Sequence, residues 1–262
     1  MAPALAAAFA AILAFAAWRA RTLSSGGAVA AWAVGAAVLT GCGWLGAAIL
    51  LTFFVSASAV SRIPPAMTVA LDPKGSRRDG WQVCANGGAA ALASLLAWRH
   101  VVPPDAALWM LTASLAAAAA DTWATSIGGA SRRPPRDLLT GAAVPAGTSG
   151  GVTWMGTGGA AAGAFAVSLP AALSGHSGPA VAGTIIGISG MLIDSALGAG
   201  VQGRFYCPRC GRQSEWSRHR CGTRTRHEGG WRWLSNDGVN AIATGAAALA
   251  GGLAWAWFSP SS

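Results

Sequence analysis

Long apolar runs occupy most of this chain and leave little room for a water-soluble fold. The longest extends from residue 27 to residue 60, which is about twice the length that one membrane span requires. It is interrupted at Gly41-Cys42-Gly43, where we expect a tight turn between two spans. Only 10% of the 262 residues are charged, against about 25% in soluble domains. The chain is therefore predicted to be an integral membrane protein.

The apolar runs predict an all-α bundle of about eight spans in a single transmembrane domain, residues 1–262, with a small polar cytoplasmic insert at residues 203–234. The predicted spans are 3–18, the two halves of 27–60, 82–99, 106–127, 151–172, 180–201 and 236–258. The 36 glycines and many alanines fit such a bundle, because small residues let helices approach closely in lipid.

Basic residues are confined to alternate loops. The loops after predicted spans one, three, five and seven hold 17 of the 18 Lys and Arg residues. Because loops rich in Lys and Arg stay in the cytoplasm, we expect these loops inside and both termini outside. The net charge of +9 then reflects orientation in the membrane, and we expect no nucleic-acid partner.

Three aspartates, Asp121, Asp194 and Asp237, lie near the predicted cytoplasmic ends of spans. A carboxylate in an apolar helix is costly and usually functional. Carboxylates that share an ion with phosphates and water suit Mg²⁺, so we expect a Mg²⁺ site here. The alternatives are pairing with a nearby Arg and, for Asp237, capping of the helix that starts at Asn236.

Cationic and glycine-rich segments near these carboxylates suggest phosphate binding. The run from Gly147 to Thr153 can offer N–H and hydroxyl groups to phosphate at a helix start, although such starts also occur where membrane helices pack tightly. Arg62 and Lys74 are expected to hold an anionic substrate, with a purely topological role as the alternative. The candidate substrate- or nucleotide-binding residues are Asn86, Thr122, Thr148, Ser149, Gly150, Thr153, Asp237 and Asn240.

The polar insert carries two short Cys/His motifs, Cys207-Pro208-Arg209-Cys210-Gly211 and His219-Arg220-Cys221-Gly222. Three cysteines and one histidine at this spacing suit a tetrahedral structural zinc site. The expected ligands are Cys207, Cys210, His219 and Cys221, with His227 as an alternative fourth ligand. An unmetallated loop and a redox-active Cys pair are the competing interpretations.

Six segments in order through the chain resemble one family of membrane proteins. They are SRIP at 61–64, RDGWQVCANGG at 78–88, ADTWAT at 120–125, GTSGGVT at 147–153, IDSALGA at 193–199 and NDGVN at 236–240. The family they resemble is an integral membrane domain of unknown function that includes plant phytyl-phosphate kinase. Where that family usually has Glu, this chain has Ser126, which removes a possible acidic ligand.

The region from Asp121 to Gly151 is also similar, more distantly, to cytidine-nucleotide enzymes of lipid synthesis. The shared pattern is Asp121-Thr122-x-Ala124-x-x-x-Gly128, then a basic loop and a Ser/Thr-Gly run. Dolichol kinase, phytol kinase, CDP-diacylglycerol synthase and CDP-archaeol synthase are such enzymes. This likeness implies CTP as the donor and Mg²⁺ as the cofactor.

Together these features favour a CTP-dependent kinase that phosphorylates an isoprenoid monophosphate such as phytyl phosphate. Asp121, Asp194, Arg62 and Lys74 are the predicted catalytic residues. Two alternatives stay open at this point: a CTP-dependent cytidylyltransferase on a lipid phosphate, and a non-enzymatic lipid transporter or scaffold. The sequence leaves the oligomeric state open.

Overall fold

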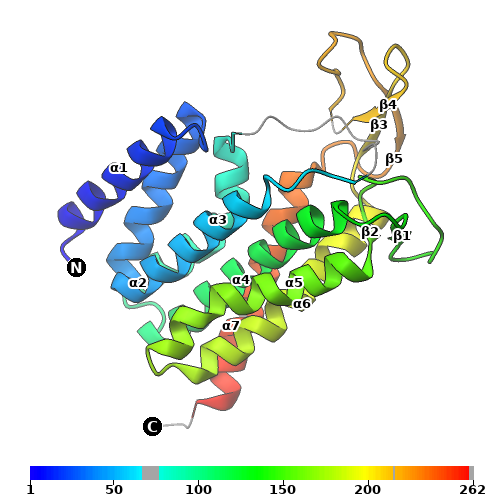
Figure 1. The fold of residues 1–262 in the computed structure, drawn as a ribbon. Coiled ribbons are helices and arrows are strands. Elements are labelled where there is room, and N and C mark those ends of the chain that lie inside the picture. The colour runs from blue at the N-terminus through cyan, green and yellow to red at the C-terminus, as the bar shows by residue number, and fades with distance from the viewer. Residues whose placement is uncertain (67–76, 215, 260–262) are drawn as a thin grey trace.

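The computed structural model describes residues 1–66, 77–214 and 216–259, so the predicted catalytic Lys74 lies outside the described residues. The described chain is mainly helical (Figure 1). Its helices are α1 (Pro3–Arg19), α2 (Ser25–Val60), α3 (Gly80–Trp98), α4 (Pro104–Gly129), α5 (Trp154–Leu173), α6 (Ser177–Gly200) and α7 (Asn236–Phe258).

Helix α2 doubles back on itself at Gly43. That residue has non-helical backbone angles, with φ 60° and ψ −152°, in a region that glycine adopts at little cost. Arg78 contacts both ends of this helix. Its carbonyl accepts a hydrogen bond from the Ser24 N–H, and its guanidinium lies 5.4 Å from the Phe53 ring centroid. A straight helix would separate Ser24 from Phe53 by about 43 Å. The predicted turn is confirmed, and α2 consists of two arms.

Helix α4 lies at the centre of the bundle, in contact with α2, α3, α5, α6 and α7. Most of its residues from Ala106 to Ala120 are buried, and most of these are alanine. Small residues on the neighbouring helices allow close contact. A Cβ atom at Gly163 of α5 would lie 2.7 Å from the Trp123 ring, and one at Gly187 of α6 would lie 2.8 Å from the Ala116 Cβ.

Four helices, α2, α5, α6 and α7, are long and apolar enough to cross a membrane by length and composition, and α1 is a shorter apolar helix. The central helix α4 is not among these four helices, because its sequence is less apolar. Because other helices surround α4, its sequence can be rich in Ala, Ser and Thr and need not present long apolar side chains to lipid. The predicted count of eight spans stays a prediction.

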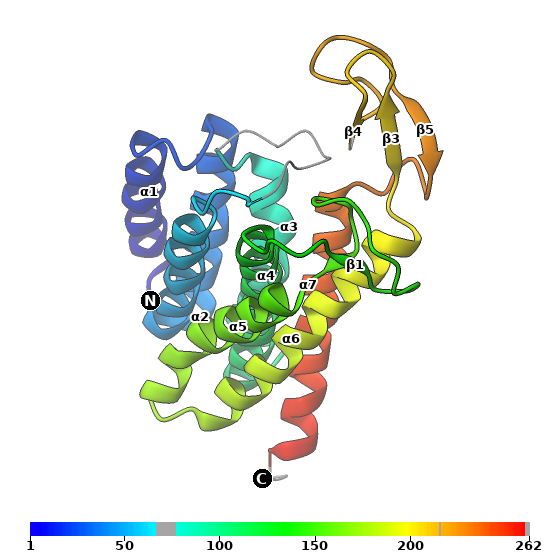
Figure 2. The same cartoon turned by 45° about the vertical axis from the view of Figure 1, so that its right-hand side comes forward.

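One end of the bundle gathers the segments that carry the candidate site. Helices α2, α4 and α6 end there, and α3, α5 and α7 begin there, next to the polar insert (Figures 1 and 2). Both chain termini lie away from this end. This alternation of helix directions is the one that the basic loops predict.

The polar insert is a small antiparallel sheet, so the all-α expectation is incomplete here. Strands β3 (Arg204–Cys207), β4 (Arg212–Ser214) and β5 (Arg226–Gly229) pair in the order β4-β3-β5. Burial alternates along β3, with Phe205 and Cys207 buried, as expected for a strand with one covered face. A further two-stranded ribbon joins β1 (Arg136–Asp137) to β2 (Gly151–Val152).

Candidate functional site

Two of the three predicted carboxylates are brought together by parallel packing of α4 and α6. A Cβ atom at Gly190 of α6 would lie 2.6 Å from the Ala117 Cβ of α4, so the two helices are in close contact at this level. Asp121 and Asp194 each lie four residues further on, which is about one helical turn. The two carboxyl groups are close enough for a Coulombic interaction. The structure therefore forms an acidic pair from two separate helices.

Asp194 is the member of this pair with less exposed surface, 8% of the residue. Its Oδ2 atom is buried and has no hydrogen-bond partner among the described residues. Asp121 is partly buried. A buried carboxylate oxygen without a partner is costly unless a cation or a proton satisfies it. The pair therefore fits a Mg²⁺ ion that takes its remaining ligands from phosphate and water.

Asp237 lies in the first turn of α7, at the same end of the bundle. The side chain that caps this helix is Ser235, whose Oγ accepts a hydrogen bond from the Gly238 N–H at 3.3 Å. The capping role proposed as an alternative for Asp237 is thus filled by its neighbour. Its predicted metal role stays a prediction.

The glycine-rich loop from Gly147 to Gly151 packs on the C-terminal turn of α6. Gly150 has φ 79°, and a Cβ atom there would lie 2.4 Å from the Ala199 Cβ. Only glycine satisfies both constraints. Ala199 lies five residues after Asp194, about 8 Å along the helix. The loop is therefore held near the acidic pair.

The hydroxyl groups of this loop differ in their surroundings. Ser149 Oγ accepts a hydrogen bond from Gln202 Nε2 at 3.1 Å. Thr148 Oγ1 is buried and has no partner among the residues described by the structure. Thr153 caps α5, because its Oγ1 accepts from the Gly156 N–H at 2.9 Å. Thr148 is thus the hydroxyl of this loop that is buried without a hydrogen-bond partner among the described residues.

The remaining predicted polar residues donate hydrogen bonds within their own helices. Thr122 Oγ1 donates to the Ala118 carbonyl at 2.8 Å. Asn86 and Asn240 donate through Nδ2 to the carbonyls four residues earlier, at 2.9 and 3.0 Å. In each of these hydrogen bonds the donor and the acceptor belong to the same helix.

Two polar residues that sequence analysis missed connect separate elements. Thr244 of α7 donates from Oγ1 to the Ala85 carbonyl of α3 at 2.9 Å, and Gln202 binds Ser149. Thr244 had no distinctive sequence signal within its apolar helix. Gln202 did have one, because it is a polar residue directly after the apolar run that ends α6.

Arg62 lies on an exposed turn after α2. The chain that follows it reaches the C-terminal end of α4, where the Ala66 N–H donates to the Gly129 carbonyl at 2.8 Å. Asp121 lies on the same helix, about two turns before Gly129. The structure therefore places the Arg62 segment at the same end of the bundle as the acidic pair.

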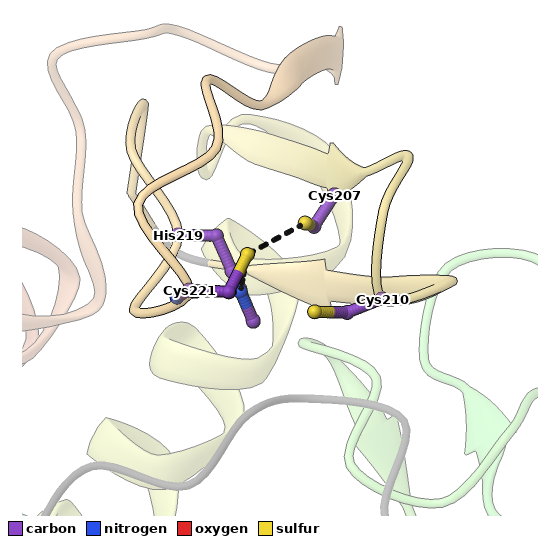
Figure 3. A group of neighbouring side chains, drawn as sticks. All are labelled: Cys207, Cys210, His219 and Cys221. Atoms are coloured by element: carbon purple, nitrogen blue, oxygen red, sulfur yellow. Dashed lines mark hydrogen bonds between the residues drawn. The ribbon is translucent and has the colours of Figure 1, made fainter.

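Within the polar insert, Cys207, Cys210, His219 and Cys221 form one group, hereafter the Cys/His cluster (Figure 3). Their potential ligand atoms all lie within 4.8 Å of one another. His219 Nδ1 is 3.1 Å from Cys221 Sγ, and the Sγ atoms of Cys207 and Cys221 are 3.7 Å apart. The cluster could hold a metal ion.

The alternative ligand His227 lies outside the cluster. Its Nε2 atom is 3.0 Å from the Gly230 carbonyl, and its ring packs edge-on against Phe205 with 5.4 Å between ring centroids. The structure therefore groups His219, and not His227, with the three cysteines.

The thiols of the Cys/His cluster have different proton affinities. Hydrogen bonds with the Thr223 hydroxyl and backbone, and then with His219, lower the pKa of Cys221 to about 5. The hydrogen bond with Cys221 is the largest of the causes that raise the pKa of Cys210 to about 11. The two pKa shifts have opposite directions, so ionisation is favoured at Cys221 over Cys210, and a thiolate is the form of cysteine that binds metal ions.

Comparison with known proteins places the chain in a family. The profile of the family described as "Integral membrane protein DUF92" matches residues 8–248. The chain is 32% identical to an uncharacterized membrane protein, MJ0933, of Methanocaldococcus jannaschii over 182 residues, which cover 69% of this chain and 75% of the relative. It is 27% identical to Protein PGR of Arabidopsis thaliana over 224 residues, or 75% of this chain and 77% of the relative. No solved structure matches. From these matches and the apolar helices, the chain belongs to the integral membrane protein family DUF92.

Proposed function

We propose that this protein is a membrane kinase that transfers a phosphoryl group from CTP to an isoprenoid monophosphate such as phytyl phosphate. The observation that carries the proposal is the parallel packing of α4 and α6. It pairs Asp121 with Asp194 beside the Gly147–Gly151 loop. A carboxylate pair next to a loop rich in N–H and hydroxyl groups suits a metal-bound nucleotide.

Asp121 and Asp194 would hold Mg²⁺, which when bound neutralises charge on the donor phosphates. The Thr148 hydroxyl would bind a phosphate oxygen, together with N–H groups of the loop other than those of Thr148 and Gly151, which donate to the Pro145 and Thr148 carbonyls. Arg62 and Lys74 would offset the charge on the transferred group. Asn86, Asn240, Thr122 and Asp237 would contribute further polar groups to the same site. No step of the transfer involves the Cys/His cluster.

The chemistry of the acceptor explains why this site needs few reactive groups. An oxygen of the lipid phosphate forms the new bond to the γ-phosphorus of CTP, and the bond from that phosphorus to the β-bridging oxygen breaks, releasing CDP. Because a phosphate monoester is already ionised at neutral pH, no side chain has to remove a proton from it. Positioning and charge neutralisation can then supply most of the catalysis.

Exposed tryptophans support a placement of the bundle across a membrane. At the end that carries the insert, the exposed tryptophans near helix starts are Trp81, Trp154 and Trp233. At the opposite end, exposed tryptophans are Trp44, next to the turn within α2, and Trp98 and Trp257, in the last turns of α3 and α7. Tryptophan is enriched at both interfaces of a membrane, so two such belts support eight helical segments as eight spans.

The same belts suggest the depth of the acidic pair. Gly128 of α4 contacts Gly156 at the start of α5, two residues from Trp154. Asp121 lies seven residues before Gly128, or about 10 Å deeper along the helix. We therefore propose that the acidic pair lies just below the cytoplasmic interface, within reach of a lipid phosphate.

The test is an assay of the purified protein in lipid nanodiscs with CTP, Mg²⁺ and phytyl or geranylgeranyl phosphate. Formation of the prenyl diphosphate and CDP would support the kinase. A CDP-lipid and pyrophosphate would instead indicate cytidylyl transfer, and lipid movement without nucleotide consumption would indicate a transporter.

A matched pair of variants ties the activity to the acidic pair. Asp121→Asn should abolish transfer, whereas Asp105→Asn should retain it. Asp105 lies on the same helix α4 but in its first turn, at the opposite end of the bundle. Equal loss of activity in both variants would contradict the proposed site.

A further inference from the structure

The spacing of the Cys/His cluster is close to that of a tetrahedral zinc site, although its ligand atoms lie up to 4.8 Å apart. In a tetrahedral zinc site with Zn–S bonds of about 2.3 Å and Zn–N bonds of about 2.0 Å, two sulfurs lie about 3.8 Å apart and a sulfur and a nitrogen about 3.5 Å apart. The Cys207 and Cys221 sulfurs are 3.7 Å apart, and His219 Nδ1 is 3.1 Å from the Cys221 sulfur. The four side chains come from separate turns of the insert and lie close together (Figure 3).

Two tight turns hold the ligands in place. The Gly211 N–H donates to the Cys207 carbonyl at 2.9 Å, and the Gly222 N–H donates to the His219 carbonyl at the same distance. Gly211 and Gly222 have φ values of 65° and 85°, which suit glycine at the end of such a turn. Each turn supplies two of the four ligands, as in zinc knuckles.

The insert has very little else with which to hold its fold. From Arg204 to Trp233, its buried side chains among the described residues are Phe205, Cys207, Ser214 and His219. Two of these belong to the Cys/His cluster itself. A segment of about 30 residues with so small a core usually needs a metal or disulfides, and all three of its cysteines are free thiols.

We propose that the Cys/His cluster binds one Zn²⁺ ion in a closed site of four protein ligands, and that this ion is structural. Four protein ligands leave no open position for substrate or water, which distinguishes structural from catalytic zinc. Thiolates and a histidine select zinc over the Mg²⁺ expected at the acidic pair.

The root of the insert connects the zinc site to the glycine-rich loop. Strand β3 starts directly after α6, and in that junction Gln202 Nε2 binds Ser149 Oγ. The Arg204 guanidinium donates to the Ala199 carbonyl at 2.8 Å, and the Trp231 N–H donates to the Val201 carbonyl at 2.8 Å. By fixing the sheet, zinc fixes this junction and with it the loop, so its effect on the candidate site is one of positioning.

The first test measures metal in the full-length protein, purified in detergent without chelators. One zinc per chain is expected by elemental analysis. Replacement by Co²⁺ should give the absorption bands of tetrahedral cobalt with thiolate ligands. Protein without metal after reconstitution, a different native metal, or a disulfide within the cluster by mass spectrometry would overturn the proposal.

Matched variants assign the ligands. Cys210→Ser and His219→Ala should weaken zinc binding by at least about tenfold. Cys84→Ser replaces an exposed cysteine on α3, and His227→Ala replaces the histidine outside the cluster, so both should retain the metal. Retention of zinc by His219→Ala, or its loss in His227→Ala, would overturn the ligand assignment.

The second test examines the structural role in the wild-type chain and does not depend on catalysis. Chelation should increase amide hydrogen exchange in the insert and in the Gly147–Gly151 loop, and added zinc should reverse the change. Unchanged exchange in both segments after metal removal would overturn the structural role. Hydrogen exchange in these two segments is measured without CTP. Its outcome is therefore independent of whether the proposed kinase activity is found.

Discussion

The acidic pair and the Cys/His cluster are built in opposite ways. Asp121 and Asp194 are far apart in the sequence and meet only because α4 and α6 pack in parallel at a particular register. The members of the Cys/His cluster all come from residues 207–221, where two turns bring them together. A site in the bundle thus depends on helix packing, whereas the site in the insert depends on local backbone geometry and on its ligand.

This contrast predicts the largest effect for the acidic pair. Asp194→Asn keeps the size of the side chain but removes the charge that would hold Mg²⁺. Phosphoryl transfer should fall on the order of a thousandfold, while zinc content stays unchanged. Both are measurable on one preparation, by product formation and by elemental analysis. Loss of zinc in this variant would show that the two sites are not separate.

The second prediction concerns the buried cysteine of the cluster. Cys207→Ser should lose the zinc ion, expose the insert to protease and reduce transfer by about tenfold, because zinc acts only through the position of the loop. Limited proteolysis and kinetics would report the two effects, with Cys84→Ser as the control. A loss of activity as large as that of Asp194→Asn would erase the distinction between the two sites.

The third prediction concerns the contact between the glycine-rich loop and α6. Gly150→Ala would combine a left-handed backbone with a clash against Ala199, so we expect a loss of roughly 2–4 kcal/mol of stability. Gly141→Ala has a similar φ of 70° but open space around it, and it should cost only about 1 kcal/mol. Thermal unfolding of both variants in detergent would measure the difference. Equal costs would mean that the loop is not tightly packed on α6.

The smallest predicted effect is that of the hydrogen bond between Gln202 and Ser149. Gln202→Ala and Ser149→Ala should each cost about 1 kcal/mol, and the double variant should cost little more than either. If Ser149 also binds nucleotide, its variant alone should raise the KM for CTP. Additive costs in the double variant would contradict the hydrogen bond.

Several features of the fold could be predicted from the sequence because they depend on local residues. The turn at Gly43 follows from glycines within an apolar run that is too long for one span. The start of α7 follows from Ser235, which caps it. The grouping of the Cys/His cluster follows from Cys-x-x-Cys-Gly and His-x-Cys-Gly turns, in which few conformations are possible.

Other features could not be predicted because they depend on contacts between distant segments. The sequence favoured His219 and kept His227 as an alternative, and only the sheet register, which directs His227 toward Gly230, excluded His227 from the cluster. The insert was expected as a loop because its short strands have too few residues for a clear alternation. The hydrogen bond of Thr244 could not be predicted, because its acceptor on α3 is close only when α7 packs against α3.

The sequence by itself determined that this chain is an apolar helical membrane protein, with its basic loops on one side and a compact set of metal-binding residues in its insert. These properties depend on composition and on short-range spacing, which lipid, charge and turn geometry constrain directly. The tertiary structure decided which carboxylates meet and which loop lies near them. That outcome depends on the register of α6 against α4, which close contacts such as Gly190 against Ala117 set, and such contacts exist only after the helices have packed.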